Sequence, residues 1–288
     1  MSKLICGCGY LGTRVAALWK QQGQHVYVLT RSREHAEQFA AQGLSPINGD
    51  VTEPETLKEL ENLEIDTVLY AIGLDRRAGK PMSEVYVDGL KHVLKRLPKS
   101  LSRFIYISST GVYGGLDGEW MDEDSPCEPE RENGKICLEA EDLLTSHPEF
   151  GSKSILLRLA GIYGPGRVPY RQQLINGEPI AVPGSGYLNL IHVEDAARVV
   201  LQAEAQAPLP RLYTVSDGNP PQRKDYYEEA AKLLEAPEPL FEAPPADSPV
   251  AQRARSNKRI RNVRLVEELN PEFQFPTYRE GLQGILGR

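Results

Sequence analysis

The nine residues from Leu4 to Gly12 constrain the fold of this chain more than any other stretch. A short apolar run leads directly into glycines spaced as G-x-G-x-x-G. This pattern predicts a buried strand that turns sharply into a helix: Gly7 permits the turn, Gly9 lets a pyrophosphate approach the backbone, and Gly12 lets the helix pack close to the strand. The helix N-terminus then offers N–H groups and a positive dipole end to phosphates. Because the pattern alone is a weak signal, the following segments must supply its context.

The order of those segments predicts an α/β fold, a Rossmann-type doubly wound parallel sheet. Apolar residues at helical spacing alternate with compact β-prone runs. Such alternation gives parallel strands joined by right-handed crossovers. The expected strands are His25–Thr30, Leu44–Ile47, Asp66–Ala71, Arg103–Ile107 and Ser154–Leu159, and the expected helices are Tyr10–Gln22, Glu34–Gln42, Glu53–Glu61 and Met82–Leu97.

The pattern changes after Gly164-Pro165-Gly166, where short segments are broken by prolines. We expect residues 1–164 to form the NAD(P)-binding domain, with residues 187–215 returning to it, and residues 165–288 to form a small substrate-binding lobe. Helices are expected at Glu194–Ala205 and Tyr226–Leu234, and the proline-rich stretch Pro237–Pro249 is expected to be a surface loop.

Composition excludes several classes of function. The net charge of −7 argues against general nucleic-acid binding, which needs a basic face. No apolar run approaches the ~20 residues of a membrane span, and no signal-peptide pattern is present, so we expect a cytoplasmic protein. Cys6 and Cys8 are interpreted as small residues that pack a tight turn. The five histidines have no metal-ligand spacing, so we predict no metal.

Two arginines at the end of the second predicted strand bear on the choice of cofactor. In a Rossmann unit this position lies beside the adenosine ribose, where an acidic residue accepts from the 2′-hydroxyl and an arginine pairs with a 2′-phosphate. Arg31 and Arg33 therefore favour NADP over NAD, and the alternative is a pair of solvated arginines. Asp50 is placed to accept from the adenine amino group or to cap its own loop. The predicted cofactor set is completed by Tyr10, Leu11, Val51, Tyr70 and Ala71.

Three later motifs, Tyr106–Gly114, Leu157–Gly166 and Ile191–Ala197, identify a family resemblance. With the glycine turn, they make the chain similar to the extended short-chain dehydrogenase/reductase superfamily. Within it, the similarity is to the NAD(P)-dependent epimerase/dehydratase group, which acts largely on nucleotide sugars. The resemblance implies that Ser109 orients a substrate hydroxyl and that a homodimer forms through the helices containing Met82 and Asn133.

The usual catalytic pair of that family is missing. The resemblance places Asn133 where the family has its acid/base tyrosine and Cys137 where it has the lysine. A phenol with an unperturbed pKa of ~10 needs an adjacent cation to exchange protons near neutral pH. Lys135 is no replacement, because two residues along a helix turn a side chain by roughly 200°. Tyr86, Tyr113 and Cys137 are candidate substitutes, and each could instead be a packing residue.

On the substrate side we place Tyr163, Arg167 and His192, and we expect a structural rather than a catalytic role for His192. A basic cluster near the C-terminus either recognises a phosphate or carboxylate on the substrate or is a solvated segment. Its members are Arg253, Arg255, Lys258, Arg259, Arg261 and Arg264.

Two functions remain open at this stage. The first is an NADP-dependent oxidoreductase or epimerase acting on a nucleotide sugar or a related small anionic metabolite, with Ser109 polarising the substrate. The second is a catalytically inactive protein in which NADP occupancy regulates contacts with a partner.

Overall fold

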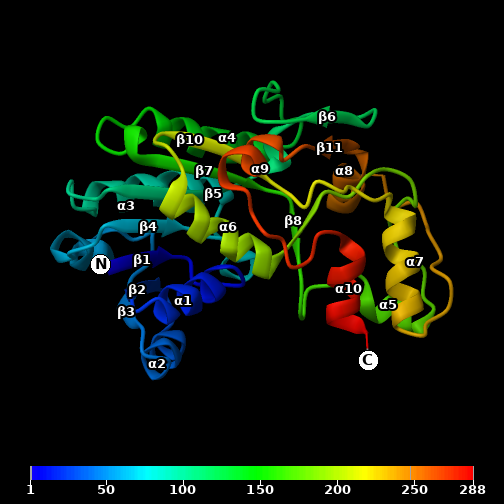
Figure 1. Ribbon diagram of the computed structural model, residues 1–288, viewed down its shortest axis with the longest axis horizontal. Helices are drawn as coiled ribbons and strands as arrows, with labels where there is room; N and C mark the ends of the chain where they lie inside the picture. The colour runs from blue at the N-terminus through cyan, green and yellow to red at the C-terminus, as the bar shows by residue number, and fades with distance from the viewer. Residues whose placement is uncertain (1, 247, 288) are drawn as a thin grey trace. The chain divides into compact units, whose positions relative to one another are not determined.

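A computed structural model describes residues 2–246 and 248–287, and its central element is a seven-stranded parallel sheet (Figure 1). The strand order is β10-β7-β5-β4-β1-β2-β3. The chain runs outward from β1 to β3 and then crosses back to β4 on the other side of β1. This reversal confirms the predicted doubly wound sheet. In such sheets ligands bind outside the carboxyl ends of the strands at the point of reversal, which here lies between β1 and β4. The strands are β1 (Ser2–Cys6), β2 (His25–Thr30), β3 (Ser45–Asn48), β4 (Thr67–Tyr70), β5 (Arg103–Ser109), β7 (Ser154–Leu159) and β10 (Arg211–Val215).

The helices that connect these strands lie close to their predicted positions, with two differences in type. Residues 54–62 form a 3₁₀ helix, η1, and their buried Leu57 and Leu60 are three residues apart, which is the period of a 3₁₀ helix. The helix predicted from Met82 contains a π turn, η3, ahead of its main α-helical part. The elements are α1 (Gly12–Gln21), α2 (Arg33–Ala41), η1 (Pro54–Asn62), η3 (Glu84–Asp88), α3 (Gly89–Arg96), α4 (Glu132–Thr145) and α6 (Val193–Gln206).

Alternating side chains of the central strand β1 face the two sides of the sheet, as the period of two in a strand requires. Leu4 and Cys6 join an apolar core that includes residues of η1, α3 and α4, such as Leu57, Leu90 and Leu144. On the opposite side, Ile5 contacts the start of α1. Both faces of β1 are therefore covered, which explains why Leu4, Ile5 and Cys6 are all apolar and fully buried.

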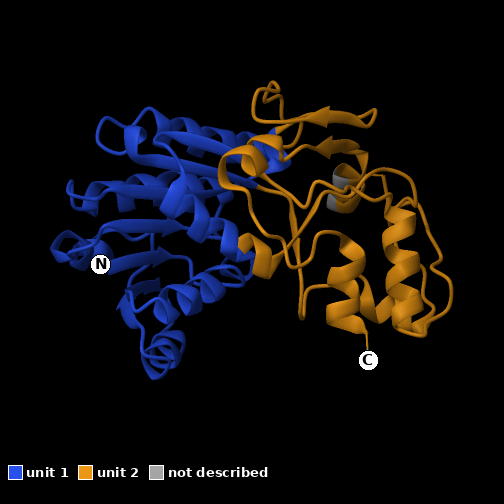
Figure 2. Ribbon diagram, in the orientation of Figure 1, with its two compact units in different colours: residues 1–112, 132–158, 197–213 blue, residues 113–131, 159–196, 214–288 orange. Residues whose placement is uncertain are grey.

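The chain divides into two compact units, each assembled from separate segments (Figure 2). Unit 1 contains residues 1–112, 132–158 and 197–213, and unit 2 contains residues 113–131, 159–196 and 214–288. Unit 1 holds most of the parallel sheet and the glycine turn.

Unit 2 has its own apolar core, formed mainly by aromatic side chains that include Tyr163, Tyr226 and Tyr278. Two short parallel pairs, β6 with β11 and β8 with β9, join its segments. Residues 237–246 of the predicted proline-rich loop contain neither helix nor strand, and Asp247 lies outside the described residues. The elements are β6 (Glu119–Met121), β8 (Gly161–Tyr163), α5 (Arg171–Asn176), β9 (Leu190–His192), α7 (Arg223–Leu233), α8 (Pro249–Arg255), β11 (Lys258–Ile260), α9 (Val263–Leu269) and α10 (Tyr278–Leu286).

Candidate functional site

The three glycines of the turn in unit 1 have different surroundings. Gly7 has φ +95°, and a Cβ there would lie 2.5 Å from the carbonyl oxygen of Ala71, at the end of β4. A Cβ on Gly12 would lie 2.6 Å from the carbonyl oxygen of Gly7. These two glycines are therefore required by the protein's own packing. Gly9 differs, because a Cβ there would meet no described atom within 4 Å.

This turn fits a dinucleotide pyrophosphate. The exposed position of Gly9 lies between β1 and the start of α1, at the positive end of the helix dipole. The amides of Thr13 and Arg14 donate to the carbonyl oxygens of Gly9 and Leu11, both at 3.0 Å. No acidic residue occupies the first turn of α1 to oppose an anion. The sequence pattern does not single out Arg14, whose guanidinium lies 4.4 Å from the centre of the Tyr10 ring and donates to the Tyr10 carbonyl oxygen at 2.7 Å. Arg14 thus adds a cation beside the turn. The side chain of Leu11, another predicted cofactor residue, is buried.

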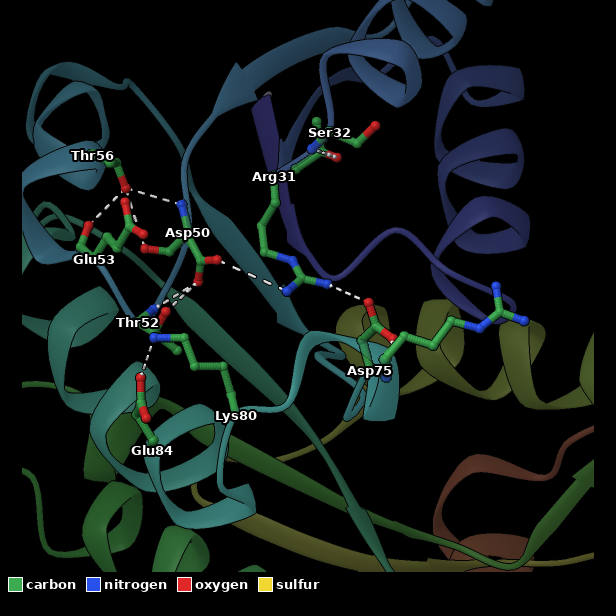
Figure 3. Close-up of polar contacts among 11 residues, drawn as sticks. Arg31, Ser32, Asp50, Thr52, Glu53, Thr56, Asp75, Lys80 and Glu84 are labelled. Carbon is green, nitrogen blue, oxygen red and sulfur yellow. Dashed lines mark hydrogen bonds and ion pairs between the residues drawn. The ribbon is translucent and has the colours of Figure 1, made fainter.

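Arg31 lies directly after β2, and Figure 3 shows it extended between two carboxylates. Its Nη2 donates to Asp75 Oδ2 at 3.0 Å, and its Nη1 lies 3.9 Å from Asp50 Oδ2. Arg33 is the exposed first residue of α2, which Ser32 caps by accepting from the His35 amide. The parallel sheet therefore brings Arg31 and Asp50, which follow β2 and β3, to the same edge. Asp75 was not predicted.

The other predicted cofactor residues lie at the carboxyl ends of β3 and β4. Asp50 does form the loop cap that was one of its two interpretations, since its Oδ1 accepts from the amide and hydroxyl of Thr52. Val51 is buried, and its carbonyl oxygen accepts from His92 Nδ1 at 2.7 Å. The Tyr70 ring is buried in the core beside Tyr106. Val51 and Tyr70 can therefore contact a cofactor only through their backbones, whereas Ala71 forms the wall behind Gly7.

Ser109 ends β5 at the same carboxyl edge of the sheet. It is partly exposed, and its Oγ accepts from the Gly111 amide at 3.0 Å at the start of the 3₁₀ turn η4 (Thr110–Val112). The hydroxyl hydrogen of Ser109 is thus available for a substrate oxygen. The neighbouring Ser108 donates to the buried carboxylate of Glu141 on α4, which also pairs with Arg158 on β7 at 2.6 Å. This buried cluster fixes α4 against the strand that ends in Ser109.

Asn133 and Cys137 lie on the same side of α4 as Glu141, four residues apart each time. Asn133 is exposed near the start of the helix, and Cys137 is buried one turn later. Lys135 is exposed, and its different position around the helix axis agrees with the expectation that it cannot replace the missing lysine.

Tyr86 lies on the π turn η3, which packs against α4. Its hydroxyl accepts from the Leu74 amide at 3.2 Å and so supports the loop after β4. Burial is the main cause that raises the pKa of Tyr86, and the nearby Cys137 thiol raises it further. An acid/base tyrosine needs the opposite shift, toward neutral pH.

The other three predicted substrate residues, Tyr163, Arg167 and His192, lie in unit 2. The Tyr163 ring is buried edge-on to the His192 ring, and its hydroxyl donates to the Thr277 carbonyl oxygen at 3.4 Å. His192 is also buried, and its ring is tilted by 38° against the Phe275 ring with 3.8 Å between the ring centres. Both residues pack the core, as expected for His192, and their contact with a substrate stays a prediction. Arg167 is exposed on a turn that begins at Gly164.

One buried carboxylate of unit 2 was not predicted from the sequence. Asp217 is 5% exposed, and its Oδ2 has no hydrogen-bond partner among the described residues. Burial raises its pKa to about 7, with a smaller contribution from the carboxylates of Asp195 and Glu280.

The predicted basic cluster is built into the same unit rather than freely solvated. Lys258 is buried, donates to the Tyr113 carbonyl oxygen at 2.6 Å and has its pKa lowered to about 8, mainly by burial. The Arg259 guanidinium lies 4.6 Å from the centre of the Trp120 ring, and Arg264 pairs with Asp124. Arg255 and Arg261 are exposed, and the side chain of Arg253 lies outside the described residues.

The described residues contain no cluster of three or more side chains suited to a metal ion. None of the described helices is long and apolar enough to cross a membrane.

Comparisons with known proteins agree with this geometry. The model of the NAD dependent epimerase/dehydratase family matches residues 4–215. Protein YeeZ of Escherichia coli (strain K12) is 30% identical over 280 residues, covering 94% of this chain and 95% of YeeZ. A 4-hydroxy-2-methyl-3-oxo-4-farnesyl-3,4-dihydroquinoline-1-oxide ketoreductase of Stigmatella aurantiaca is 27% identical and covers 76% of this chain and 69% of its own length.

A solved structure shows the same fold at lower identity. The UDP-glucose 4-epimerase of Thermotoga maritima, solved with UDP-glucose, superposes with a TM-score of 0.84 over 98% of this chain and 96% of the epimerase. Its sequence is 18% identical, so this likeness concerns the fold alone.

Proposed function

Because this chain belongs to the NAD-dependent epimerase/dehydratase family, we propose that it is an NADP-dependent oxidoreductase or epimerase acting on a nucleotide sugar or a similar small anionic metabolite. The observation that carries the proposal is the environment of the three glycines. Gly7 and Gly12 are held against the protein's own backbone, while the space in front of Gly9 is open. No contact with the described residues requires a glycine at Gly9. A glycine there instead leaves room for a pyrophosphate to approach the backbone.

The residues of unit 1 divide the work of binding and orientation. The turn and the start of α1 bind the pyrophosphate, and Arg31 and Arg33 pair with the 2′-phosphate. When bound, the nicotinamide supplies the hydride chemistry. Ser109 donates its hydroxyl hydrogen to a substrate oxygen, since its own oxygen already accepts from the Gly111 amide.

The substrate class is proposed from exposed arginines in unit 2. Arg167, Arg255 and Arg261 can bind a phosphate or carboxylate, because guanidinium groups fork onto such oxygens. The epimerase with the same fold was solved with UDP-glucose, whereas the Stigmatella relative is named for a farnesylated quinoline oxide. A panel of substrates should therefore include carbonyl compounds as well as sugar nucleotides.

Two observations favour a second candidate, a regulatory protein that binds NADP without turnover. Asn133 has no titratable proton at neutral pH. Tyr86 has a raised pKa, and its hydroxyl supports the Leu74 amide. In this alternative, occupancy of the dinucleotide site changes the contacts with a partner.

One experiment separates the two candidates. The purified protein is mixed with NADPH, binding is measured, and absorbance at 340 nm is followed over sugar nucleotides and carbonyl compounds. Oxidation with at least one compound supports the enzyme. Tight binding without turnover across the panel supports the regulator. If the protein binds neither NADPH nor NADH, both candidates are excluded.

The assignment of the 2′-phosphate has its own test. The double variant Arg31→Ala, Arg33→Ala should weaken binding of NADPH more than binding of NADH. The matched control is Arg171→Ala, an exposed arginine on α5 that should change neither affinity. Equal losses for the two dinucleotides in the double variant would refute the assignment.

A further inference from the structure

We propose that Asp75 competes with the adenosine 2′-phosphate for Arg31 and thereby sets how strongly this protein prefers NADP over NAD. The inference rests on the proposed function, because it concerns the same dinucleotide site. It identifies a specificity-determining residue on the loop after β4, 44 positions from the arginine that it contacts.

Both terminal nitrogens of the Arg31 guanidinium face a carboxylate (Figure 3). Nη2 donates to Asp75 at 3.0 Å, and Nη1 lies 3.9 Å from Asp50. A phosphate forks onto an arginine through two parallel N–H bonds. Since Asp75 already accepts from one of these nitrogens, a 2′-phosphate that uses this edge of Arg31 must displace the Asp75 carboxylate.

Of the two carboxylates, Asp75 is held less firmly than Asp50 and can be displaced. The Asp50 side chain is 22% exposed, and two hydrogen bonds from Thr52 hold its Oδ1. The Asp75 side chain is 47% exposed, and its Oδ1 accepts from the amide of Arg77, in the 3₁₀ turn η2 (Arg76–Ala78). An ion pair exposed on both sides is weak, and a dianionic phosphate can replace it at small cost.

The loop nevertheless keeps the negative charge of Asp75 near the site. The preceding residue, Leu74, donates its amide to the Tyr86 hydroxyl, and the Arg77 amide holds Asp75 Oδ1. The Arg77 amide is the main cause that holds the pKa of Asp75 below its usual range, and Arg31 adds to it. The carboxylate is therefore ionised at neutral pH and repels a 2′-phosphate even after it has left Arg31. NADH has no phosphate there and escapes both effects.

The test compares the Kd values of NADPH and NADH for the wild type and Asp75→Asn. Asparagine keeps the oxygen that accepts from the Arg77 amide and removes the charge. We expect NADPH to bind about two- to fivefold more tightly to Asp75→Asn, with NADH unchanged. Asp75→Glu keeps the charge and should retain the wild-type preference. Asp88→Asn, which loses another exposed pair in the same unit, is the matched control and should alter neither Kd.

The outcomes distinguish this inference from the proposed function. If the wild type binds NADPH and Asp75→Asn binds it equally or more weakly, Asp75 either has no effect on binding at Arg31 or orients that side chain. Only the proposed competition is then overturned. If the wild type binds neither dinucleotide, the inference and the proposed function fall together. Raising the salt concentration should narrow the difference between the wild type and Asp75→Asn, since both effects are electrostatic.

Discussion

Replacing Gly9 by alanine separates what this protein needs for folding from what it needs for its ligand. A Cβ at Gly9 meets no described atom within 4 Å, and its φ lies outside the left-handed region. We therefore expect Gly9→Ala to change the free energy of unfolding by no more than about 0.5 kcal/mol. The added methyl group would stand where the pyrophosphate must approach, so NADPH should bind at least about tenfold more weakly, a loss of about 1.4 kcal/mol.

Gly7→Ala is the contrasting variant. Its Cβ would lie 2.5 Å from the carbonyl oxygen of Ala71, a backbone atom that cannot move aside cheaply. Overpacking of this kind costs about 1–3 kcal/mol. The φ of +95° adds about 1–2 kcal/mol for a residue with a side chain. Together these terms should lower the thermal midpoint by roughly 5–15 °C.

The assay pairs two measurements on each variant. Urea or thermal unfolding gives the stability, and a fluorescence or calorimetric titration gives the Kd of NADPH. The account requires that Gly9→Ala be stable with weakened binding, and that Gly7→Ala be destabilised. It is refuted if Gly9→Ala binds NADPH as tightly as the wild type, or if it loses as much stability as Gly7→Ala.

Four further substitutions test other parts of the site and fold. Ser109→Ala should lower turnover about tenfold by removing one hydrogen bond to the substrate, with the Kd of NADPH unchanged; equal turnover would remove Ser109 from the site. Tyr86→Phe should keep the wild-type turnover in steady-state kinetics, because a phenol with a raised pKa exchanges protons poorly near neutral pH. Loss of activity with intact folding would identify Tyr86 as the acid/base residue. Glu204→Gln should cost about 1–3 kcal/mol in urea unfolding, since Glu204 pairs with the buried Lys3, which keeps Asp66 as a second partner; a loss below about 0.5 kcal/mol would contradict this. Asp217 holds its proton up to about pH 7 in the folded state, whereas an unfolded aspartate releases it near pH 4. The stability of the wild type should therefore fall as pH rises from about 4 to 7, and Asp217→Asn should remove that fall. If the stabilities of the variant and the wild type change in parallel with pH, Asp217 is not the group responsible.

The sequence was sufficient for the features that depend on local patterns. The glycine spacing predicted the turn from β1 into α1, and alternating apolar segments predicted the doubly wound sheet. The positions of Arg31 and Asp50 at strand ends placed them at one edge of the sheet, because parallel strands share that edge. The type of helix at residues 54–62 could not be predicted from the pattern, since apolar residues at Leu57 and Leu60 suit both a 3₁₀ and an α-helix.

Contacts between distant residues could not be predicted in this way. Asp75 approaches Arg31 only because a loop folds back after β4, and no spacing in the sequence encodes that approach. The pairing of Glu141 with Arg158 and Ser108 similarly joins a helix to two strands. Such partners depend on the tertiary packing of elements whose sequences carry no mutual pattern.

The central claim is that the turn from Leu4 to Gly12, together with Arg31, forms a dinucleotide site that prefers NADP. Isothermal titration of the wild-type protein with NADPH and then with NADH tests it most directly. We expect saturable binding of one dinucleotide per chain, with a lower Kd for NADPH than for NADH. Binding of neither dinucleotide, or tighter binding of NADH, would contradict it.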